Sequence, residues 1–364
     1  MCAALLPCVF ATGSEETVAR SIPGFPASPR RASRCAAFSG RRPAAMRPTC
    51  PAFSCQQGRA ALAVLLGSTT GLSTARLRGA PAAIPRFQRI FLSDPLPGGS
   101  NGKYQVLGNM MVDAARLRCP DRRPAQRQPP TLGIFTGSRD YMVKHMLPFF
   151  TMVAGHVSAT RPEVRWLLGK ADYVTLEMLT ASAADPAGRL IEGENARWEP
   201  APPYGRLISD RGVVIEVLPP GEVMARADLI LTIPGTNTAE LTALGIPMIV
   251  LVPTYYAEVH PMPGVLGHVG RLPILGRYVK RACALAYHRH VRYHAHPNRK
   301  RRAEVVPEIS GRITSRQVAD RVCAMLVHPL EPMEAELASI MGPPGATGRL
   351  VDEVLSWMRE RITQ

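Results

Sequence analysis

The chain has 364 residues, and its 44 Lys and Arg against 28 Asp and Glu give a formal net charge of +16. This length allows one large domain or two ordinary ones, but 35 Pro and 30 Gly exceed what a single compact domain usually carries. The composition therefore excludes one uniformly folded core, and we expect part of the chain to be unfolded.

The positive charge is concentrated in two segments. Residues 1–59 contain eight Arg and only two acids, and Arg271–Arg302 contains ten Arg or Lys and no acid. Such a balance is typical of proteins with an anionic partner, for example nucleic acid, phosphate or an acidic membrane. The two segments differ in composition, so each has its own interpretation.

Residues 1–100 have the composition of an organelle-targeting leader, because they are rich in Arg, Ser, Ala and Pro and poor in acids. Such a segment buries too little apolar surface to offset its chain entropy. Its apolar run at residues 60–66 is also much shorter than the roughly 20 residues that span a bilayer. We expect import into a plastid, or alternatively a mitochondrion. A disordered tail or a wrongly joined gene model are the other interpretations.

The cysteines indicate neither a metal site nor a disulfide. Five of the eight lie in the leader, at spacings that form no CxxC pair. Cys119, Cys283 and Cys323 are far apart in the sequence and are expected to act as small apolar residues in a reducing compartment. We expect no metal and no other cofactor.

Beyond Thr131 short apolar runs alternate with longer mixed segments, and each run ends at a Gly or Pro. This alternation predicts a Rossmann-like parallel sheet with flanking helices, of the α/β class, over residues 101–364. The expected strands are 131–136, 164–168, 213–218, 229–233 and 248–252. The expected helices are 140–158, interrupted by Pro148, then 221–227, 236–244 and two near the C-terminus around 318–326 and 350–358.

The expected strand 229–233 is followed at once by Pro234, Gly235 and a helix that opens with small polar residues. Unpaired N–H groups and the helix dipole attract an anion at such a point, and Gly235 allows a phosphate to approach the backbone. Donors and acceptors for a bound nucleotide would be Thr236, Asn237, Thr238 and Glu240. A plain helix cap with a nearby acid is an equally weighted interpretation.

Gly137, Ser138 and Arg139 follow the first expected strand and open a helix in the same way. The guanidinium of Arg139 can meet a diphosphate through two hydrogen bonds. Two such turns on one parallel sheet are stronger evidence than one, because their helix N-termini emerge at the same edge and converge on one ligand.

The segment 232–252 resembles the donor-binding motif of lipid-A-disaccharide synthases, most closely the cyanobacterial and plastid-type relatives. Gly235–Leu241 and Leu244–Val250 carry the likeness. Other segments resemble the family in the expected order, so that together they cover residues 104–326. These segments are Leu107–Asp113, Phe135–Arg139, Pro297–Asn298 and Val306–Thr314.

This resemblance implies the C-terminal, UDP-binding half of a GT-B glycosyltransferase, an inverting and metal-free hexosyl transfer, and UDP-diacylglucosamine as donor. It implies that Gly137, Ser138 and Arg139 face the diphosphate, and that residues 235–238 with Glu240 face phosphate and ribose. The family's N-terminal acceptor domain has no counterpart before Tyr104, and Thr136 and Ile233 depart from the bacterial pattern. The expectation is therefore donor binding, with the catalytic residues unknown and transfer by this chain alone incomplete.

In the basic run Arg271–Arg302, apolar residues interleave with the charges. An amphipathic segment on an anionic membrane surface, where it could meet a lipid acceptor, and a solvated cationic face are the two main interpretations. Nucleic acid and metal fit less well. Two functions remain open for the whole chain, a UDP-sugar-binding glycosyltransferase domain and a non-catalytic nucleotide-binding or interaction protein.

Overall fold

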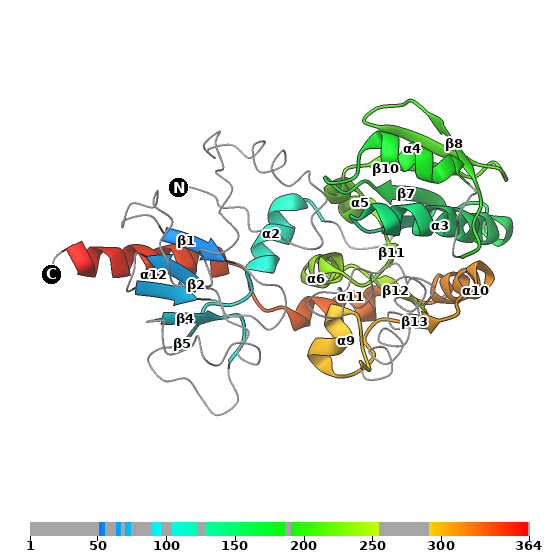
Figure 1. Ribbon diagram of the computed structural model, residues 1–364. Helices are drawn as coiled ribbons and strands as arrows, with labels where there is room; N and C mark the ends of the chain where they lie inside the picture. The colour runs from blue at the N-terminus through cyan, green and yellow to red at the C-terminus, as the bar shows by residue number, and fades with distance from the viewer. Residues whose placement is uncertain are drawn as a thin grey trace, which may run out of the picture. The chain divides into compact units, whose positions relative to one another are not determined.

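The structure, a computed structural model, describes residues 51–54, 63–66, 70–73, 89–95, 104–122, 128–185, 191–254 and 291–362. The chain divides into two compact units (Figure 1). The smaller consists of Met1–Asp113 with Gly342–Gln364, and the larger is Ala114–Met341. A targeting leader that ends near residue 100 stays a prediction.

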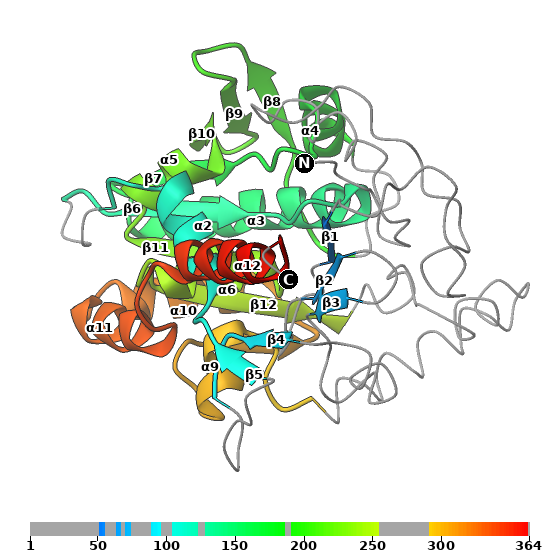
Figure 2. The ribbon, with the colours of Figure 1, turned by 90° about the vertical axis from the view of Figure 1, so that its left-hand side faces the viewer.

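The larger unit is built on an eight-stranded sheet in the order β13-β12-β11-β6-β7-β10-β9-β8. Neighbouring strands from β13 to β10 are parallel, whereas β9 and β8 continue the sheet in antiparallel fashion beyond β10 (Figure 2). The strands are β6 Thr131–Phe135, β7 Arg165–Gly169, β8 Ala196–Glu199, β9 Gly205–Ser209, β10 Val214–Leu218, β11 Leu229–Thr232, β12 Met248–Pro253 and β13 Glu308–Gly311.

The central strands explain why the apolar runs of the sequence form this sheet. Every residue of β6, β11 and β12 is buried, as expected for parallel strands that are covered on both faces. The helices that cover them are α3 Asp140–Thr160, α4 Leu176–Ala184, α5 Pro220–Arg226, α6 Thr236–Ala243, α9 His296–Arg301, α10 Ser315–Met325 and α11 Glu331–Ile340.

Two groups of helices cover the sheet. Helix α3 packs with α4 and α10, and α6 packs with α9 and α11. Helix α3 connects β6 to β7, its neighbour on one side of the sheet. Helix α6 connects β11 to β12, so the chain moves across the sheet in the opposite direction. Because parallel crossovers are right-handed, α3 and α6 must cover opposite faces. The predicted α/β class with a Rossmann-like sheet and flanking helices is thus confirmed.

Helix α3 differs from the expectation at Pro148, because it continues without a break to Thr160. Proline inside a helix costs about 3 kcal/mol. Met146, Leu147, Phe149 and Phe150, which flank it, are all fully buried, and burial of one such side chain stabilises by about 1.5–3 kcal/mol. Packing of this segment therefore outweighs the lost hydrogen bond.

The smaller unit contains a sheet of five short strands in the order β1-β2-β3-β4-β5. Phe91 and Leu92 of β4 are buried, so part of the folded chain lies before residue 100. This unit also holds α12 and the start of α2, which ends in the larger unit. Its elements are β1 Pro51–Ser54, β2 Ala63–Leu66, β3 Thr70–Ser73, β4 Arg89–Leu92, β5 Tyr104–Val106, α2 Met110–Arg118 and α12 Ala346–Ile362.

Asp113 fastens the beginning of α12. Its carboxylate accepts hydrogen bonds from the backbone N–H of Gly345 (2.6 Å) and of Thr347 (2.7 Å). Burial alone would raise the pKa of Asp113, but the amides of Thr347 and Gly345 and the charge of Arg349 bring it below its usual range. The ionised carboxylate is therefore favoured by the fold, as at a helix N-cap.

We expect Asp113→Ala to lower the free energy of unfolding at pH 7 by about 0.5–2 kcal/mol, the usual cost of losing an N-cap acceptor. A group whose pKa is lowered by folding stabilises above its unfolded pKa, near 3.9, and loses this contribution as the pH falls through the lower folded value. Urea unfolding should therefore show a gap between the parent and the variant at pH 7 that closes below about pH 3. The control Asp352→Ala removes an exposed carboxylate of the same helix. A gap that is equal at both pH values would contradict the assignment.

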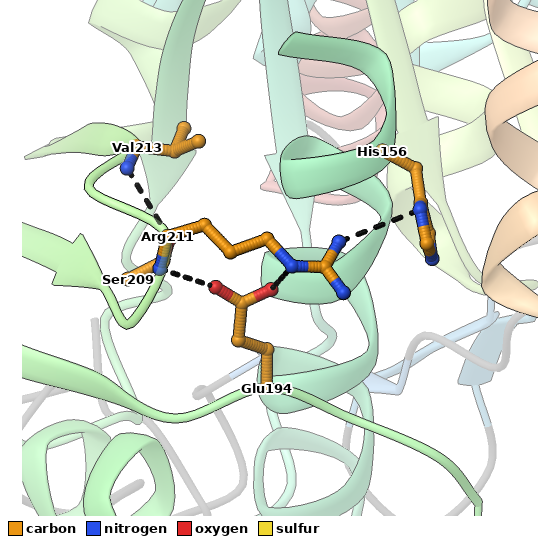
Figure 3. Close-up of polar contacts among 5 residues, drawn as sticks. All are labelled: His156, Glu194, Ser209, Arg211 and Val213. Atoms are coloured by element: carbon orange, nitrogen blue, oxygen red, sulfur yellow. Dashed lines mark hydrogen bonds and ion pairs between the residues drawn. The ribbon is translucent and has the colours of Figure 1, made fainter. Parts of the chain in front are cut away.

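Arg211, in the loop between β9 and β10, contacts both the buried acid Glu194 and His156 on α3 (Figure 3). Glu194 accepts a hydrogen bond from the backbone N–H of Arg211 (2.9 Å) and forms an ion pair with its Nε (3.4 Å). Its side chain is 7% exposed. The Arg211 Nη1 lies 3.4 Å from His156 Nδ1 on α3. A Cβ at Gly155 would lie 2.9 Å from Glu194 Oε2 and 3.1 Å from Arg211 Nη1, so glycine leaves room for this pair.

Gly155→Ala should therefore destabilise the protein, although alanine is the better helix former by about 1 kcal/mol. Overpacking of this kind typically costs about 1–3 kcal/mol. The matched control is Gly348→Ala in α12, where a Cβ meets nothing within 4 Å. Urea denaturation should show a lower midpoint for Gly155→Ala and an unchanged or higher one for the control. A higher midpoint for both variants would refute the close packing at Gly155.

Cys119 is buried and Cys323 is half-buried, and both are free thiols. Burial raises the pKa of each thiol, which lowers its thiolate fraction and its reactivity. These two cysteines therefore behave as the small apolar residues predicted from the sequence. Cys283 lies outside the described residues.

Candidate functional site

The two glycine-containing loops predicted to bind phosphate leave the sheet side by side. Strands β6 and β11 are parallel neighbours, with Phe135 opposite Thr232 at their carboxyl ends. The loops also contact each other, because a Cβ at Gly137 would lie 2.9 Å from Ile233 Cδ1. The structure therefore brings together the two segments that the sequence separates by about a hundred residues.

This edge is a topological switch point. From β6 the chain moves outward through β7 to β10, and it then returns to β11 on the other side of β6. The following helices, α3 and α6, cover opposite faces, so the chain leaves the carboxyl ends of β6 and β11 in opposite directions. Ligands of open α/β sheets bind in the crevice at such a point.

The first loop is shaped by Gly137, whose φ of +93° lies in the left-handed region. Ser138 and Arg139 follow, and the Arg139 carbonyl accepts hydrogen bonds from the N–H of Met142 (2.9 Å) and Val143 (3.0 Å). Arg139 is thus the N-cap of α3. Its guanidinium is close enough to act on Tyr141: burial raises the pKa of that phenol, and the charge of Arg139 opposes the rise. A cation therefore lies at the N-terminal end of the helix, where the dipole adds further positive potential.

The second loop exposes its backbone at Gly235, the N-cap of α6. The Gly235 carbonyl accepts from the Thr238 N–H (3.2 Å) and from its hydroxyl (2.8 Å). A Cβ at Gly235 would meet only the amide group of Asn237, with Oδ1 at 2.8 Å. Apart from this amide group and the chain neighbours of Gly235, no atom lies within 4 Å of that Cβ.

Thr238 and Asn237 differ from the expectation that their side chains are donors for a nucleotide. Thr238 is buried, and its hydroxyl donates to Gly235 O and accepts from the backbone N–H of His296 (3.2 Å). Asn237 Nδ2 donates to Thr232 Oγ1, and its Oδ1 accepts from the Thr238 N–H (3.0 Å). Both side chains therefore hold the loop in shape, because at the start of a helix they satisfy the nearest backbone and strand-end groups. Thr236 is half-buried at the first helical position and stays a candidate.

Glu240 lies one turn into α6, and its side chain is 16% exposed. Arg118 Nη1 is 3.5 Å from Glu240 Oε1, and Arg118 Nη2 is 3.7 Å from Asp172 Oδ2. Burial raises the pKa of Glu240, the charge of Arg118 lowers it, and that of Asp172 raises it further. Since side chains tilt toward the N-terminus of their helix, the Glu240 carboxylate leans toward the start of α6.

The sequence did not reveal Arg118 or Asp172 as members of this cluster. Arg118 ends α2, and Asp172 lies in the loop after β7, so their meeting with Glu240 depends on the sheet order. The one available signal was the position of Asp172 directly after a strand, at the edge that carries the other loops.

The segments Pro297–Asn298 and Val306–Thr314 are connected to the second loop through a chain of hydrogen bonds. Asn298 is fully buried: its Oδ1 accepts from the N–H of Val305 (2.7 Å) and Val306 (2.9 Å), and its Nδ2 donates to Glu308 (2.8 Å). Glu308 in turn accepts from the N–H of Ala295 (2.9 Å). This network holds Ala295 in place, and the N–H of the next residue, His296, donates to Thr238. The segment therefore positions the loop at Gly235.

The described residues bear only in part on the predictions about metal, membrane and the basic run Arg271–Arg302. Among the described residues no three His, Cys, Asp or Glu are grouped to hold a metal ion. No helix in that part of the chain is long and apolar enough to cross a membrane. Of the basic run Arg271–Arg302, residues 271–290 lie outside the described part, and Arg299, Arg301 and Arg302 are exposed.

Comparison with known proteins gives a weak structural likeness. No family model matches the sequence, and no curated protein matches it. A solved structure described as a UDP-N-acetylglucosamine 2-epimerase from Listeria monocytogenes is similar over 72% of this chain and 56% of its own, with 12% identity and a TM-score of 0.38. A glycotransferase of kitacinnamycin is similar over 74% and 54%, with 15% identity and a TM-score of 0.33. The chain thus spans about half the length of either structure. At this level of likeness the fold rests on the topology of the chain itself.

Proposed function

We propose that this chain binds a UDP-sugar at the crevice between β6 and β11, as the donor-binding half of a GT-B glycosyltransferase. The observation that carries the proposal is the meeting of two glycine-containing turns at a topological switch point. Arg139 and the N-termini of α3 and α6 supply the positive potential that a diphosphate requires. The likeness of residues 232–252 to lipid-A-disaccharide synthases supports UDP as the nucleotide and an acylated glucosamine as the sugar.

The chemistry available at this edge is stabilisation of a leaving group. Backbone N–H groups near Gly235 and Gly137 and the guanidinium of Arg139 would offset the charge of the departing UDP. Transfer also requires a base and a second substrate held in line, a contribution of about 7–11 kcal/mol in well-oriented reactions. We propose that another domain or chain supplies both, and that the acceptor is a lipid-linked monosaccharide.

The experiment is a calorimetric titration of the full chain with UDP, with ADP for comparison and with controls without protein. Heat of binding and a thermal shift with UDP, stronger than with ADP, would support the proposal. Absence of both at millimolar UDP would refute it. The second candidate, a non-catalytic nucleotide-binding protein, is favoured if UDP binds but no disaccharide forms from UDP-diacylglucosamine even when an acceptor domain is added.

We also propose that residues 1–100 direct import into a plastid, on the basis of their Arg, Ser, Ala and Pro content. The expected result of fusing them to a fluorescent reporter is a plastid signal together with a shortened product on a gel. A matched fusion with the arginines of residues 1–59 replaced by glutamine should stay in the cytosol. Cytosolic fluorescence of the unaltered fusion would overturn this proposal.

A further inference from the structure

Arg118, Asp172 and Glu240 form a charge cluster at the site, in which one guanidinium contacts two carboxylates. The Nη1–Oε1 distance to Glu240 is 3.5 Å, and the Nη2–Oδ2 distance to Asp172 is 3.7 Å. The side chains of Arg118 and Asp172 are 43% and 57% exposed, against 16% for Glu240. Glu240 is therefore the member whose charge depends most on its partner.

Sheet order places the two carboxylates of this cluster on either side of β6. Strand β6 lies between β11 and β7, Glu240 belongs to the helix after β11, and Asp172 belongs to the loop after β7. A guanidinium in contact with both carboxylates therefore joins the loop after β7 to the helix after β11. The Arg118 backbone lies against the start of α5, because a Cβ at Gly221 would be 2.3 Å from the Arg118 carbonyl oxygen.

The charge balance indicates which part of a ligand this cluster would meet. Two carboxylates and one guanidinium carry a net charge of −1, so the cluster disfavours a phosphate and favours groups that donate hydrogen bonds, such as the vicinal hydroxyls of a sugar. Arg139, on the neighbouring loop, is the cation suited to the diphosphate. The two arginines therefore have different roles.

We infer that Arg118 is a positioning residue, which holds the Glu240 carboxylate at the mouth of the crevice to accept hydrogen bonds from the ribose hydroxyls of the nucleotide. This inference rests on the proposed function, since it assigns a task within the same site. Arg118 itself contacts the carboxylates and acts on the nucleotide through Glu240.

Electrostatics gives the inference a measurable pH dependence. Burial and Asp172 both raise the pKa of Glu240, and Arg118 opposes them. Without Arg118 the carboxyl stays protonated to a higher pH and loses its charge-assisted hydrogen bonds. Helices α9 and α11 also pack against α6, but the charges that act on Glu240 are those of Arg118 and Asp172. The charged or titratable residues on α9 and α11 are His296, Arg299, Lys300, Arg301, Glu331, Glu334 and Glu336.

The test compares UDP with 2′-deoxy-UDP on the full chain, the Arg118→Met variant and the Arg118→Lys variant, by calorimetry between pH 5 and 8. We expect Arg118→Met to weaken UDP binding about tenfold at pH 7 and 2′-deoxy-UDP binding less than about twofold, in line with loss of one charge-assisted hydrogen bond. The pH at which UDP binding is half lost should rise in Arg118→Met and return toward the parent value in Arg118→Lys.

Asp172→Asn provides an independent variant at an exposed side chain. Removal of its charge should move the pH midpoint of UDP binding downward, opposite to Arg118→Met. Equal losses for both nucleotides, or no loss in Arg118→Met, would overturn the inference while the parent still binds UDP. No UDP binding by the parent would overturn the proposed function itself, and this inference with it.

Discussion

Replacing Arg139 with alanine is expected to weaken UDP binding by about 1.5–3 kcal/mol, or roughly 10- to 150-fold. Arg139 is the N-cap of α3 beside the Gly137 loop, and it brings a permanent positive charge to the edge where β6 and β11 end. Asp140 places an exposed carboxylate in the same turn, so loss of the guanidinium leaves residues 137–140 with one negative and no positive side chain. Calorimetric titration of the variant measures the change.

The matched control is Arg165→Ala, which removes an exposed arginine from the first position of β7, at the opposite edge of the sheet. It should bind UDP within about twofold of the parent, since surface charges beyond a Debye length of roughly 8–10 Å are largely screened. If Arg139→Ala and Arg165→Ala bind UDP as the parent does, the diphosphate lies elsewhere.

Gly235→Val should reduce UDP affinity at least as much as loss of Arg139. The added side chain would occupy the space through which a phosphate approaches the exposed backbone at the start of α6. The φ of 176° is extended backbone that valine adopts readily, but a Cβ at this position would lie 2.8 Å from Asn237 Oδ1, so the Asn237 amide group must shift. UDP binding should therefore fall, and the thermal midpoint should fall as well because the Asn237 side chain is displaced.

Gly235→Ala gives a graded comparison, because one methyl group blocks the approach less than an isopropyl group. The expected order of affinity is parent, then Gly235→Ala, then Gly235→Val. A valine variant that binds UDP normally would place the phosphate away from α6. A valine variant that unfolds would instead show that Gly235 is required for the turn itself.

Much of the sheet in the larger unit could be predicted from the sequence, because its central strands are buried on both faces. Such strands appear as continuous apolar runs, and Gly or Pro marks where each one ends. The residues 131–135 and 229–232 therefore stand out without knowledge of the tertiary structure. The two glycine-containing loops follow from the same signals, since each directly follows one of these runs.

The edge strands could not be predicted in this way. Strands β8 and β9 mix charged, polar and apolar residues, as Ala196–Glu199 and Gly205–Ser209 show. Strand β9 pairs with β10, and β8 pairs with β9, so their position depends on these neighbours rather than on their own hydrophobicity. Pro148 led to the opposite error, since it predicted a break in a helix that continues to Thr160. Burial of the neighbouring side chains outweighs the cost of proline inside the helix.

The site could be predicted as far as its backbone but not as far as its side chains. A glycine turn before a helix indicates where N–H groups are exposed, but it does not show that the Thr238 hydroxyl is already engaged by Gly235 and His296. Likewise, no local pattern joins Arg118 to Glu240, which lies 122 positions further along the chain. Such pairs depend on the order of the strands.

The most direct test of the central claim, that a nucleoside diphosphate binds between β6 and β11, is a two-dimensional amide spectrum of the isotopically labelled chain titrated with UDP. Amide resonances report each backbone N–H separately, so they locate the ligand as well as detect it. We predict that the largest shifts fall on the residues of the two loops, 137–140 and 235–238, and that they saturate together with one dissociation constant. Shifts confined to other parts of the chain, or a spectrum unchanged by millimolar UDP, would contradict the account.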